Sequence, residues 1–314
     1  MLPSPLCVVY SDRFKEHDTG RHPENAHRMD AIIHLLKKSL PPESVLWKEP
    51  RHAAGEELAW IHEKSLIQSI KDLAETGGGS VDPDTVVSPA SFEIACLSAG
   101  AGLAGVDAIF NREARRVFIV SRPPGHHSMP SVAMGFCLFN NIALAARYAQ
   151  KQYGIERILI LDWDIHHGNG TQAVFYEDPT VFFISTHQHP LYPGTGFPHE
   201  TGKGQGKGFT RNLPFPPYTD PEIILEAVQE TLDEVVPRFK PELLLISAGF
   251  DGHREDPLGN WRLEEKHYTA LTDMARAQAN RSCEGRVLSF LEGGYNLTAL
   301  ADSCLAHCQA LFKE

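Results

Sequence analysis

The sequence predicts an α/β fold in which a mainly parallel sheet is covered by helices on both faces. Six short runs consist largely of Val, Ile, Leu and Phe, as expected for strands that are buried on both faces. They span residues 6–10, 117–121, 158–162, 181–185, 243–247 and 287–291. Segments with helical spacing separate these runs, at residues 24–40, 91–110, 140–153, 221–239, 264–281 and 297–311. Because strand and helix alternate, we expect crossover helices to join parallel strands.

The composition is that of an ordinary globular protein. The chain has 314 residues, of which 42% are hydrophobic and 22% are charged. A chain of this length buries roughly three quarters of the surface that its unfolded form exposes. No internal repeat and no shift in composition marks a boundary, so we expect one domain over residues 1–314. Two glycine-rich stretches, 77–79 and 202–208, are expected to be loops, since the second lacks the spacing of a phosphate-binding P-loop.

The charge and hydropathy of the chain argue against some partners. The formal net charge is -11 and the isoelectric point is about 5.8, which disfavours broad electrostatic binding of nucleic acid or of an anionic membrane. No apolar stretch approaches the roughly 18 residues that span a bilayer, and the first residues lack a basic segment followed by a long apolar one. We therefore expect a cytoplasmic protein with no direct nucleic-acid or membrane partner.

The six cysteines are expected to be reduced. They are scattered over predicted strands and helices, away from the spacings of a disulfide framework or a Cys-x-x-Cys motif. Cys304 and Cys308 lie four positions apart on an expected helix. An apolar helix face explains that pair better than a metal site does.

Four of the predicted strands end at residues that can bind a metal ion or transfer a proton. His126 and His127 follow the second run, and residues 162–170 (DWDIHHGNG) follow the third. Asp251 follows the fifth run, and residues 292–295 (EGGY) follow the sixth. In open parallel sheets, ligands bind beyond the carboxyl ends of the strands. The sequence therefore indicates an enzyme whose site is assembled from these strand ends.

Three of these residues form a candidate metal site. Asp164 and His166 are two positions apart after a strand, so alternation places both side chains on the same side. Asp251 is the natural third ligand. Three protein ligands with open coordination positions are typical of catalytic zinc, although this donor set also accepts Fe(II), Co(II) or Mn(II). The alternative, in which Asp164 and His166 only cap the following helix, is disfavoured by the histidines and the tyrosine at neighbouring strand ends.

The order of these motifs resembles that of a known family. Together with the segments above, the stretches HPE (22–24), RPPGHH (122–127), GFCLFNN (135–141) and YPGTG (192–196) are similar to the histone deacetylase superfamily. That superfamily includes acetylpolyamine amidohydrolases and bacterial histone deacetylase-like amidohydrolases. The resemblance covers most of the chain. It implies an arginase/deacetylase-like three-layer fold with a mainly parallel eight-stranded sheet, and zinc ligands at Asp164, His166 and Asp251.

The resemblance implies hydrolysis of an acylamide, and the chain offers a group for each step. A metal ion polarises the carbonyl and lowers the pKa of its water to about 7. His126 and His127 can face that water, while Tyr295, which follows two glycines, can donate to the oxyanion. By resemblance, Asp162 orients His126, and Asn169 stands where some members have Asp. Because a neutral Asn cannot hold a positive charge on His127, we expect His127 to be a neutral general base. The alternative for either histidine is a buried imidazole that only forms hydrogen bonds, and the alternative for Tyr295 is a tyrosine packed in the core.

The resemblance also implies a substrate tunnel and potassium sites. Phe136, beside Gly135, and Tyr192 would form aromatic walls, and Asp84 matches an acid at the rim. Arg28 either faces an internal acetate channel or forms a salt bridge on the helix surface. The residues that match the potassium sites are Asp162, Asp164, His166, Ser185 and Thr186 for the first, and Phe175, Asp178, Val181 and Phe209 for a second site lined by backbone.

The expected substrate is an acylated lysine in a protein or peptide, or a related small acylamide. One branch of polyamine deacylases places a glutamate seven residues after the last zinc aspartate, and this chain has Leu258 there. An acetylpolyamine stays an alternative because other polyamine enzymes use other acids. A binuclear manganese ureohydrolase is disfavoured because residues 167–169 supply no bridging aspartate at the expected Asp-x-His-x-Asp spacing. An inactive acyl-lysine binder is disfavoured because Tyr295, both histidines and all three ligands are present. Acyl chain length, the metal used in the cell and a homo-oligomeric state stay open.

Overall fold

Eight strands form one sheet in the order β2-β1-β5-β10-β9-β6-β7-β8, and every pair of neighbours is parallel. The computed structural model describes residues 5–313. The strands of this sheet are β1 (Leu6–Val9), β2 (Val45–Lys48), β5 (Arg116–Ile119), β6 (Ile158–Asp162), β7 (Val181–Gln188), β8 (Thr210–Phe215), β9 (Leu243–Ala248) and β10 (Val287–Leu291). Two further short strands, β3 (Gly79–Ser80) and β4 (Val86–Val87), form a separate antiparallel hairpin. The main sheet is thus entirely parallel, and the predicted α/β class is confirmed.

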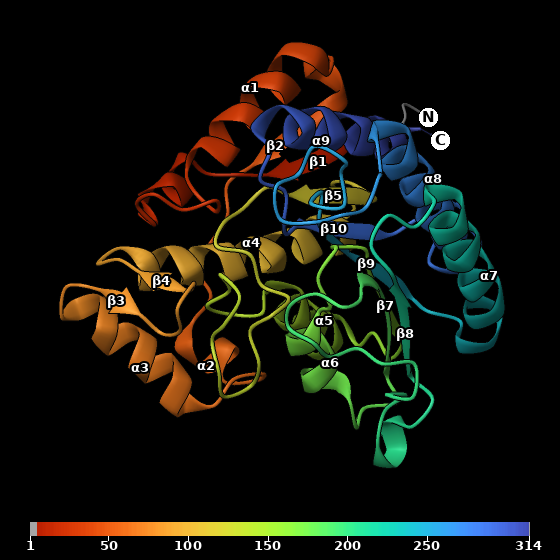
Figure 1. Cartoon of the computed structure of the whole chain (residues 1–314). Coiled ribbons are helices and arrows are strands. Elements are labelled where there is room, and N and C mark those ends of the chain that lie inside the picture. The colour runs from red at the N-terminus through yellow and green to blue at the C-terminus, as the bar shows by residue number, and fades with distance from the viewer. Residues whose placement is uncertain (1–4, 314) are drawn as a thin grey trace.

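Helices cover both faces of the sheet. On one face, α1 (His27–Ser39), α9 (Leu297–Phe312), α8 (Glu265–Ser282) and α7 (Pro221–Phe239) pack in a row (Figure 1). On the other face, α4 (Ser91–Phe110) packs against α5 (Asn141–Tyr153), with α2 (Gly55–Leu58), α3 (Lys64–Glu75) and α6 (Asn169–Phe175) beside them. Short 3-10 turns occupy Asp12–Glu16, Pro42–Ser44 and Gly204–Gly206. The result is a three-layer arrangement of helices, sheet and helices.

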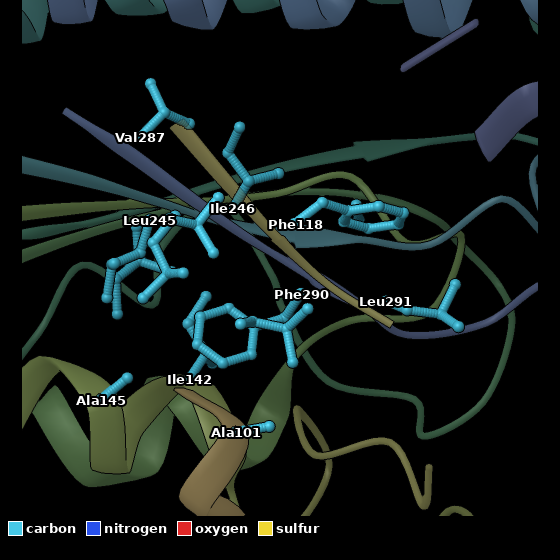
Figure 2. Close-up of a cluster of buried hydrophobic side chains, with 14 of the residues drawn as sticks. Ala101, Phe118, Ile142, Ala145, Leu245, Ile246, Val287, Phe290 and Leu291 are labelled. Atoms are coloured by element: carbon cyan, nitrogen blue, oxygen red, sulfur yellow. The ribbon is translucent and has the colours of Figure 1, made fainter. Parts of the chain in front are cut away.

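The hydrophobic core lies on both faces of the central strands. Figure 2 shows the ring of Phe290, from β10, next to Ile142 of α5, while Phe118 of β5 points to the opposite side of the sheet. Phe118 packs there against His307 of α9, with ring centroids 5.0 Å apart. Because both faces of these strands are buried away from water, apolar side chains at consecutive positions stabilise them.

Helix α4 approaches the sheet closely because glycine stands at the contact points. A Cβ atom at Gly102 would lie 2.7 Å from the ring of Phe290, and one at Gly105 would lie 2.7 Å from Leu288. By length and composition alone α4 is long and apolar enough to cross a membrane, so the expectation that no apolar stretch approaches that length is wrong. However, 83% of this apolar window is buried inside the protein. Its packing against both the sheet and α5 accounts for its apolar surface.

All six predicted strands and all six predicted helices form, with ends shifted by a few residues at most. The sequence patterns do not predict the edge strands β2 and β8, because neither is fully buried and β8 contains Pro214. An edge strand tolerates proline since one row of its backbone groups faces no partner strand. The patterns also omit α2, α3 and α6. In α3 the spacing of Leu66, Ile70 and Ala74, all buried, is a helical signal in the sequence itself.

The two remaining structural expectations are met. The glycine-rich stretches lie mostly outside regular elements, although Gly79 begins β3 and Gly204–Gly206 forms a 3-10 turn. All six cysteines are buried and free, as expected for reduced thiols.

Candidate metal and catalytic site

Four neighbouring strands at the centre of the sheet carry the candidate site. Strands β5, β10, β9 and β6 are consecutive in the sheet. The histidine pair at 126–127 follows β5, Tyr295 follows β10, Asp251 follows β9, and the segment with Asp164 and His166 follows β6. Because parallel strands all run in the same direction, their carboxyl ends meet at one edge, where these side chains gather.

Asp164, His166 and Asp251 form a compact cluster. One ligand atom from each residue lies within 4.8 Å of the others. Nδ1 of His166 is 3.0 Å from Oδ1 of Asp164 and 3.0 Å from Oδ2 of Asp251. Both acids are fully buried. Backbone N–H groups hold them in place, since Gly293 donates to Oδ2 of Asp164 at 2.8 Å and Ile165 donates to Oδ1 of Asp251 at 2.9 Å.

The donor set of this cluster fits a divalent cation. Burial, together with the charge of Asp164, raises the pKa of Asp251 to about 7. Burial alone would lower the pKa of His166, but its hydrogen bonds to Asp164 and Asp251 outweigh this and raise the pKa to about 10. A single Nδ1 proton therefore faces two buried carboxylates. A divalent cation would replace that proton and neutralise both acids, because metal binding requires a deprotonated imidazole. Two carboxylates and one imidazole suit Zn²⁺ and also Fe(II), Co(II) or Mn(II).

Glycines make room for the acids of the cluster. A Cβ atom at Gly249 would lie 2.1 Å from Oδ2 of Asp164, and one at Gly293 would lie 2.1 Å from Oδ2 of Asp251. Both distances are shorter than a non-bonded contact allows. Any larger residue at these positions would displace a carboxylate, so the glycines after β9 and β10 are part of the cluster's geometry.

His126 is held beside the cluster by an acid on β6. Its Nδ1 atom is 3.0 Å from Oδ2 of Asp162, and its Nε2 atom is 3.8 Å from Oδ1 of Asp164. Burial alone would lower the pKa of His126, but the charges of Asp164 and Asp162 outweigh it and raise the pKa to about 10. Burial raises the pKa of Asp162 to about 6. The surroundings of His126 therefore stabilise its positively charged form.

His127 lies next to His126 in a different environment. The two ring centroids are 4.0 Å apart. Nδ1 of His127 is 2.7 Å from Oδ1 of Asn169, whose Nδ2 atom donates to the sulfur of Met134 at 3.4 Å. Burial and the charges of His126 and His166 lower the pKa of His127 well below 6.5. With its Nδ1 proton donated to the amide oxygen, a neutral His127 keeps a lone pair on Nε2.

Tyr295 contacts an aromatic ring and a cation. It meets Phe136 edge to face, with ring centroids 5.8 Å apart, and the guanidinium carbon of Arg28 lies 5.1 Å from the centroid of its ring. Burial raises the pKa of Tyr295 well above 10. The phenol therefore keeps its proton at neutral pH and can act as a hydrogen-bond donor.

A pocket of about 220 Å³ opens onto these groups. Both members of the histidine pair, together with His166 and Tyr295, line it. The five residues predicted to contact substrate line it as well, namely Asp84, Gly135, Phe136, Tyr192 and Leu258. A Cβ atom at Gly135 would lie 2.5 Å from the ring of His127, and its φ of +58° also favours glycine. Tyr192 meets the ring of His127 edge to face at 5.1 Å. The pocket thus combines aromatic walls with titratable groups.

The residues predicted to bind potassium fall into two groups. In the first, Ser185 pairs with Asp162 across β7 and β6, and the hydroxyl of Thr186 donates to the carbonyl of Asp162 at 3.5 Å. In the second, the N–H of Asp178 donates to the carbonyl of Phe175 at 3.0 Å, near the start of β7 at Val181, and the carbonyl of Phe209 accepts from the N–H of Phe183 at 2.9 Å. Potassium binding stays a prediction.

The sequence patterns assign no role to Glu292, a buried acid beside the site. Its Oε2 atom accepts hydrogen bonds from the N–H groups of Gly125, at 2.7 Å, and His126, at 3.2 Å. Its Oε1 atom accepts from the hydroxyl of Ser247 at 3.1 Å. Burial raises the pKa of Glu292 to about 7. The sequence does contain a signal for Glu292, because this acid stands directly between a buried apolar run and a pair of glycines.

Arg28 does not lie on the helix surface, so the predicted alternative of a salt bridge on that surface is wrong. It is fully buried. It donates to Oε1 of Glu24 at 3.2 Å, to the carbonyl of Gly294 at 2.7 Å and to the carbonyl of Glu292. Arg122, also fully buried, donates to both carboxylate oxygens of Glu24 at 2.8 Å. One ion cluster thus joins the HPE and RPPGHH segments behind the site, and the acetate channel stays a prediction.

Comparisons with known proteins agree with this geometry. The family model of the histone deacetylase domain matches residues 22–311. A probable deacetylase from Archaeoglobus fulgidus is 39% identical over 293 residues, which cover 92% of this chain and 81% of that protein. The histone deacetylase-like amidohydrolase of Pseudomonas aeruginosa is 38% identical over 282 residues, covering 87% and 72%. The crystal structure of the HDA15 HD domain matches with a TM-score of 0.93 at 34% identity, over 98% of this chain and 89% of that one. The chain therefore belongs to the histone deacetylase family of deacetylases and amidohydrolases.

Proposed function

We propose that the protein is a zinc-dependent amidohydrolase that removes acetyl or other acyl groups from lysine side chains of proteins or peptides. The observation that supports this most is that three kinds of group meet at one pocket. The histidine pair at 126–127 and Tyr295 line it, together with His166 of the cluster that also contains Asp164 and Asp251. Together they supply metal ligands, a base and a hydrogen-bond donor, which amide hydrolysis requires.

In the proposed reaction, the side chains move one proton and stabilise one negative charge. A divalent ion held by the cluster would act as a Lewis acid toward the amide carbonyl and lower the pKa of water to about 7. His127 takes a proton from the attacking water through Nε2, since its low pKa keeps it neutral. Tyr295 donates its hydroxyl to the carbonyl oxygen as negative charge develops there. His126, charged beside Asp162, adds electrostatic stabilisation.

The second half of the reaction returns the proton. The charged imidazole of His127 gives it to the lysine nitrogen as the C–N bond breaks. A carboxylic acid and a free amine then leave. In this scheme the acyl group loses its amide nitrogen and gains the oxygen of water, so no oxidant or other co-reactant is needed.

The walls of the pocket support an aliphatic stem as the bound group. Phe136 and Tyr192 line the pocket with aromatic rings, and Leu258 adds an apolar side chain. An acylated lysine is neutral at its end, so burial of its methylene groups would contribute more to binding than a cation-π contact would.

An acetylpolyamine or other small acylamide is the second candidate. One observation favours it, because Asp84 is exposed and lines the pocket, where its charge can attract an amine. Leu258 argues the other way, since it places an apolar group where one polyamine branch has an acid. An acyl-lysine binder without activity is the third and weakest candidate, because the chain keeps the three cluster residues, both histidines and Tyr295.

The test is turnover of the zinc-loaded protein on an acetyl-lysine peptide and, in parallel, on acetylated putrescine and spermidine. Tyr295→Phe serves as the control, and loss of an oxyanion donor should reduce turnover on the order of a hundredfold. Preference for the peptide supports a lysine deacylase, whereas preference for a polyamine moves the assignment to the second candidate. Removing the metal with a chelator and restoring it with Zn²⁺, Fe(II), Co(II) or Mn(II) tests the metal. Turnover that survives complete metal removal would contradict the proposal.

A further inference from the structure

Asp256 links two parts of the pocket through its side chain. It lies in the loop after β9, between the cluster residue Asp251 and the pocket residue Leu258, and it is buried. Its Oδ1 atom accepts a hydrogen bond from the N–H of Leu258 at 3.0 Å. Its Oδ2 atom accepts from the N–H of Tyr295 at 2.6 Å and from the N–H of Asn296 at 3.3 Å. One carboxylate therefore holds three backbone N–H groups from two separate segments.

The turn that carries Tyr295 is also held from its other side. Arg28 donates through Nε to the carbonyl of Gly294 at 2.7 Å and through Nη2 to the carbonyl of Glu292. The same guanidinium lies over the ring of Tyr295. A cation thus binds the carbonyl groups of residues 292 and 294, while a carboxylate binds the N–H groups of residues 295 and 296.

Such external contacts matter here because the turn is intrinsically flexible. Gly293 is required next to the cluster, and Gly294 has a φ of +129°, which favours glycine. Glycine has the greatest backbone freedom of all residues. Two consecutive glycines before Tyr295 therefore leave the position of its phenol undefined unless other side chains restrain the backbone. Gly293 is held by Asp164 and by the N–H of Phe250, and Asp256 and Arg28 restrain the residues on either side of it.

Capping of helix α9 is the simpler explanation for Asp256, and the hydrogen bonds argue against it. Helix α9 begins at Leu297 and has its own cap, because Oδ1 of Asn296 accepts from the N–H of Ala299 at 3.1 Å. The two N–H groups that bind Asp256 at this end belong to residues before the helix. Asp256 restrains the turn and leaves the first turn of the helix to Asn296.

We propose that Asp256 is a positioning residue that fixes the phenol of Tyr295 relative to Leu258 across the pocket. The inference rests on the proposed function, since it assigns Tyr295 to turnover. A phenol that stabilises a developing oxyanion must be held within a few tenths of an ångström, because small misplacements cause large losses of rate. The hydrogen bonds of the Asp256 carboxylate reach the backbone of residues 258, 295 and 296 rather than the phenol itself.

The test compares Asp256→Asn with Glu242→Gln, alone and in a Tyr295→Phe background. Asparagine keeps the size of the side chain but replaces one acceptor oxygen by a donor, so one of the two segments loses its hydrogen bond. Glu242 is a matched control because its Oε2 atom also accepts from two consecutive N–H groups, those of Glu156 and Arg157, each at 2.9 Å. It stands before β9, at the opposite end of that strand.

We expect Asp256→Asn to lower kcat at least about tenfold, with a smaller change in KM and unchanged zinc content. Glu242→Gln should stay within about twofold of the parent protein. In the Tyr295→Phe background, Asp256→Asn should lower the remaining turnover less than about twofold, because the group it positions is gone. Turnover of Asp256→Asn near that of the parent, or an equal loss in both backgrounds, would overturn the inference.

Hydrogen exchange of the backbone amides gives a readout that does not depend on turnover. In Asp256→Asn, and in Asp256→Ser should the first variant not fold, exchange of residues 293–296 should rise at least about tenfold while that of α9 stays unchanged. Opening of α9 as well would assign Asp256 to the helix and refute the positioning role. If the parent protein turns over none of the acylamides but the local exchange rises as expected, the proposed function fails and the restraint of the turn stands.

Discussion

Oδ1 of Asn169 lies 2.7 Å from Nδ1 of His127, so the hydrogen-bond partner of this histidine is a neutral amide. His126 has a carboxylate at the corresponding place, in Asp162. Two adjacent imidazoles therefore stand in opposite electrostatic surroundings, which raise the pKa of one and lower that of the other. Such a division is common where one group must carry charge and its neighbour must accept a proton.

Replacing Asn169 by Asp should move the acid side of the pH-rate profile upward. The pKa of His127 lies well below 6.5 because of burial and the charges of His126 and His166. A carboxylate at position 169 would favour the charged imidazole and raise that pKa by about one unit or more. The neutral fraction of His127 at pH 6 then falls, and so does kcat/KM. Profiles from pH 5 to 9 test this, with the exposed Asn111→Asp as control; an unchanged acid limb would show that His127 is not the base.

Replacing Gly293 by Ala should remove the metal while leaving the fold intact. The added Cβ would lie 2.1 Å from Oδ2 of Asp251 and 2.7 Å from Oδ2 of Asp164, so at least one carboxylate must move. The expected result is a large loss of zinc content, with circular dichroism close to that of the parent protein. Gly55→Ala is the control, since nothing lies within 4 Å of its Cβ. Full zinc content in Gly293→Ala would argue against a metal at this cluster.

Replacing Glu24 by Gln should destabilise the protein strongly. Glu24 is a buried carboxylate between the buried guanidinium groups of Arg122 and Arg28, and removing one partner of a buried ion pair typically costs about 3–5 kcal/mol. The exposed Glu16, which pairs with Arg13 at 3.4 Å, offers a control. Glu16→Gln should change the free energy of unfolding by no more than about 1 kcal/mol. Urea unfolding at pH 7 measures both, and equal small effects would contradict the prediction.

The same acid predicts how stability depends on pH. Burial alone would raise the pKa of Glu24, but the charge and hydrogen bonds of Arg122 outweigh it and lower the pKa to about 2. A folded-state pKa below the unfolded one stabilises the protein fully above pH 4.5, and this stabilisation is lost as the pH falls through about 2. Urea midpoints measured from pH 5 to 2 should therefore fall less steeply for Glu24→Gln than for the parent. Parallel curves would show that Glu24 is not the group responsible.

Replacing Thr85 by Val should weaken substrate binding more than turnover. The hydroxyl oxygen of Thr85 accepts a hydrogen bond from the N–H of Phe136 at 3.0 Å, and Phe136 has a positive φ of 69°, which is strained for a residue with a side chain. Without that bond the aromatic wall loses a restraint worth about 1 kcal/mol. We expect KM to rise about fivefold with little change in kcat. Thr85→Ser keeps the hydroxyl and should behave like the parent, and a drop in kcat alone would contradict the role of Phe136 as a wall.

Local patterns in the sequence predict much of the fold and of the candidate site. The apolar runs that become β5, β6, β9 and β10 are recognisable because a doubly buried strand needs side chains that avoid water on both faces. Asp164, His166 and Asp251 are recognisable because metal-binding residue types stand at the ends of those runs. The spacing of Asp164 and His166 along the chain is local information. It predicts where their side chains point because side chains alternate in direction along an extended strand.

Other features depend on contacts between residues far apart in the sequence. That β10 lies between β5 and β9 brings Tyr295 near the histidine pair, and no local pattern specifies that strand order. Arg28 donates to the carbonyl of Gly294 across 266 positions of the chain, and Asp256 binds the N–H of Tyr295 across 39.

By itself, the sequence determined the α/β class, the buried strands and the identity of the groups that can bind a metal or a proton, because periodicity and residue type are properties of short segments. Only the tertiary structure decided that Asp256, Glu292 and Arg28 restrain the backbone around the site. It did so because a buried polar group must find partners, and those partners are known only when the distant segments that supply them have packed together.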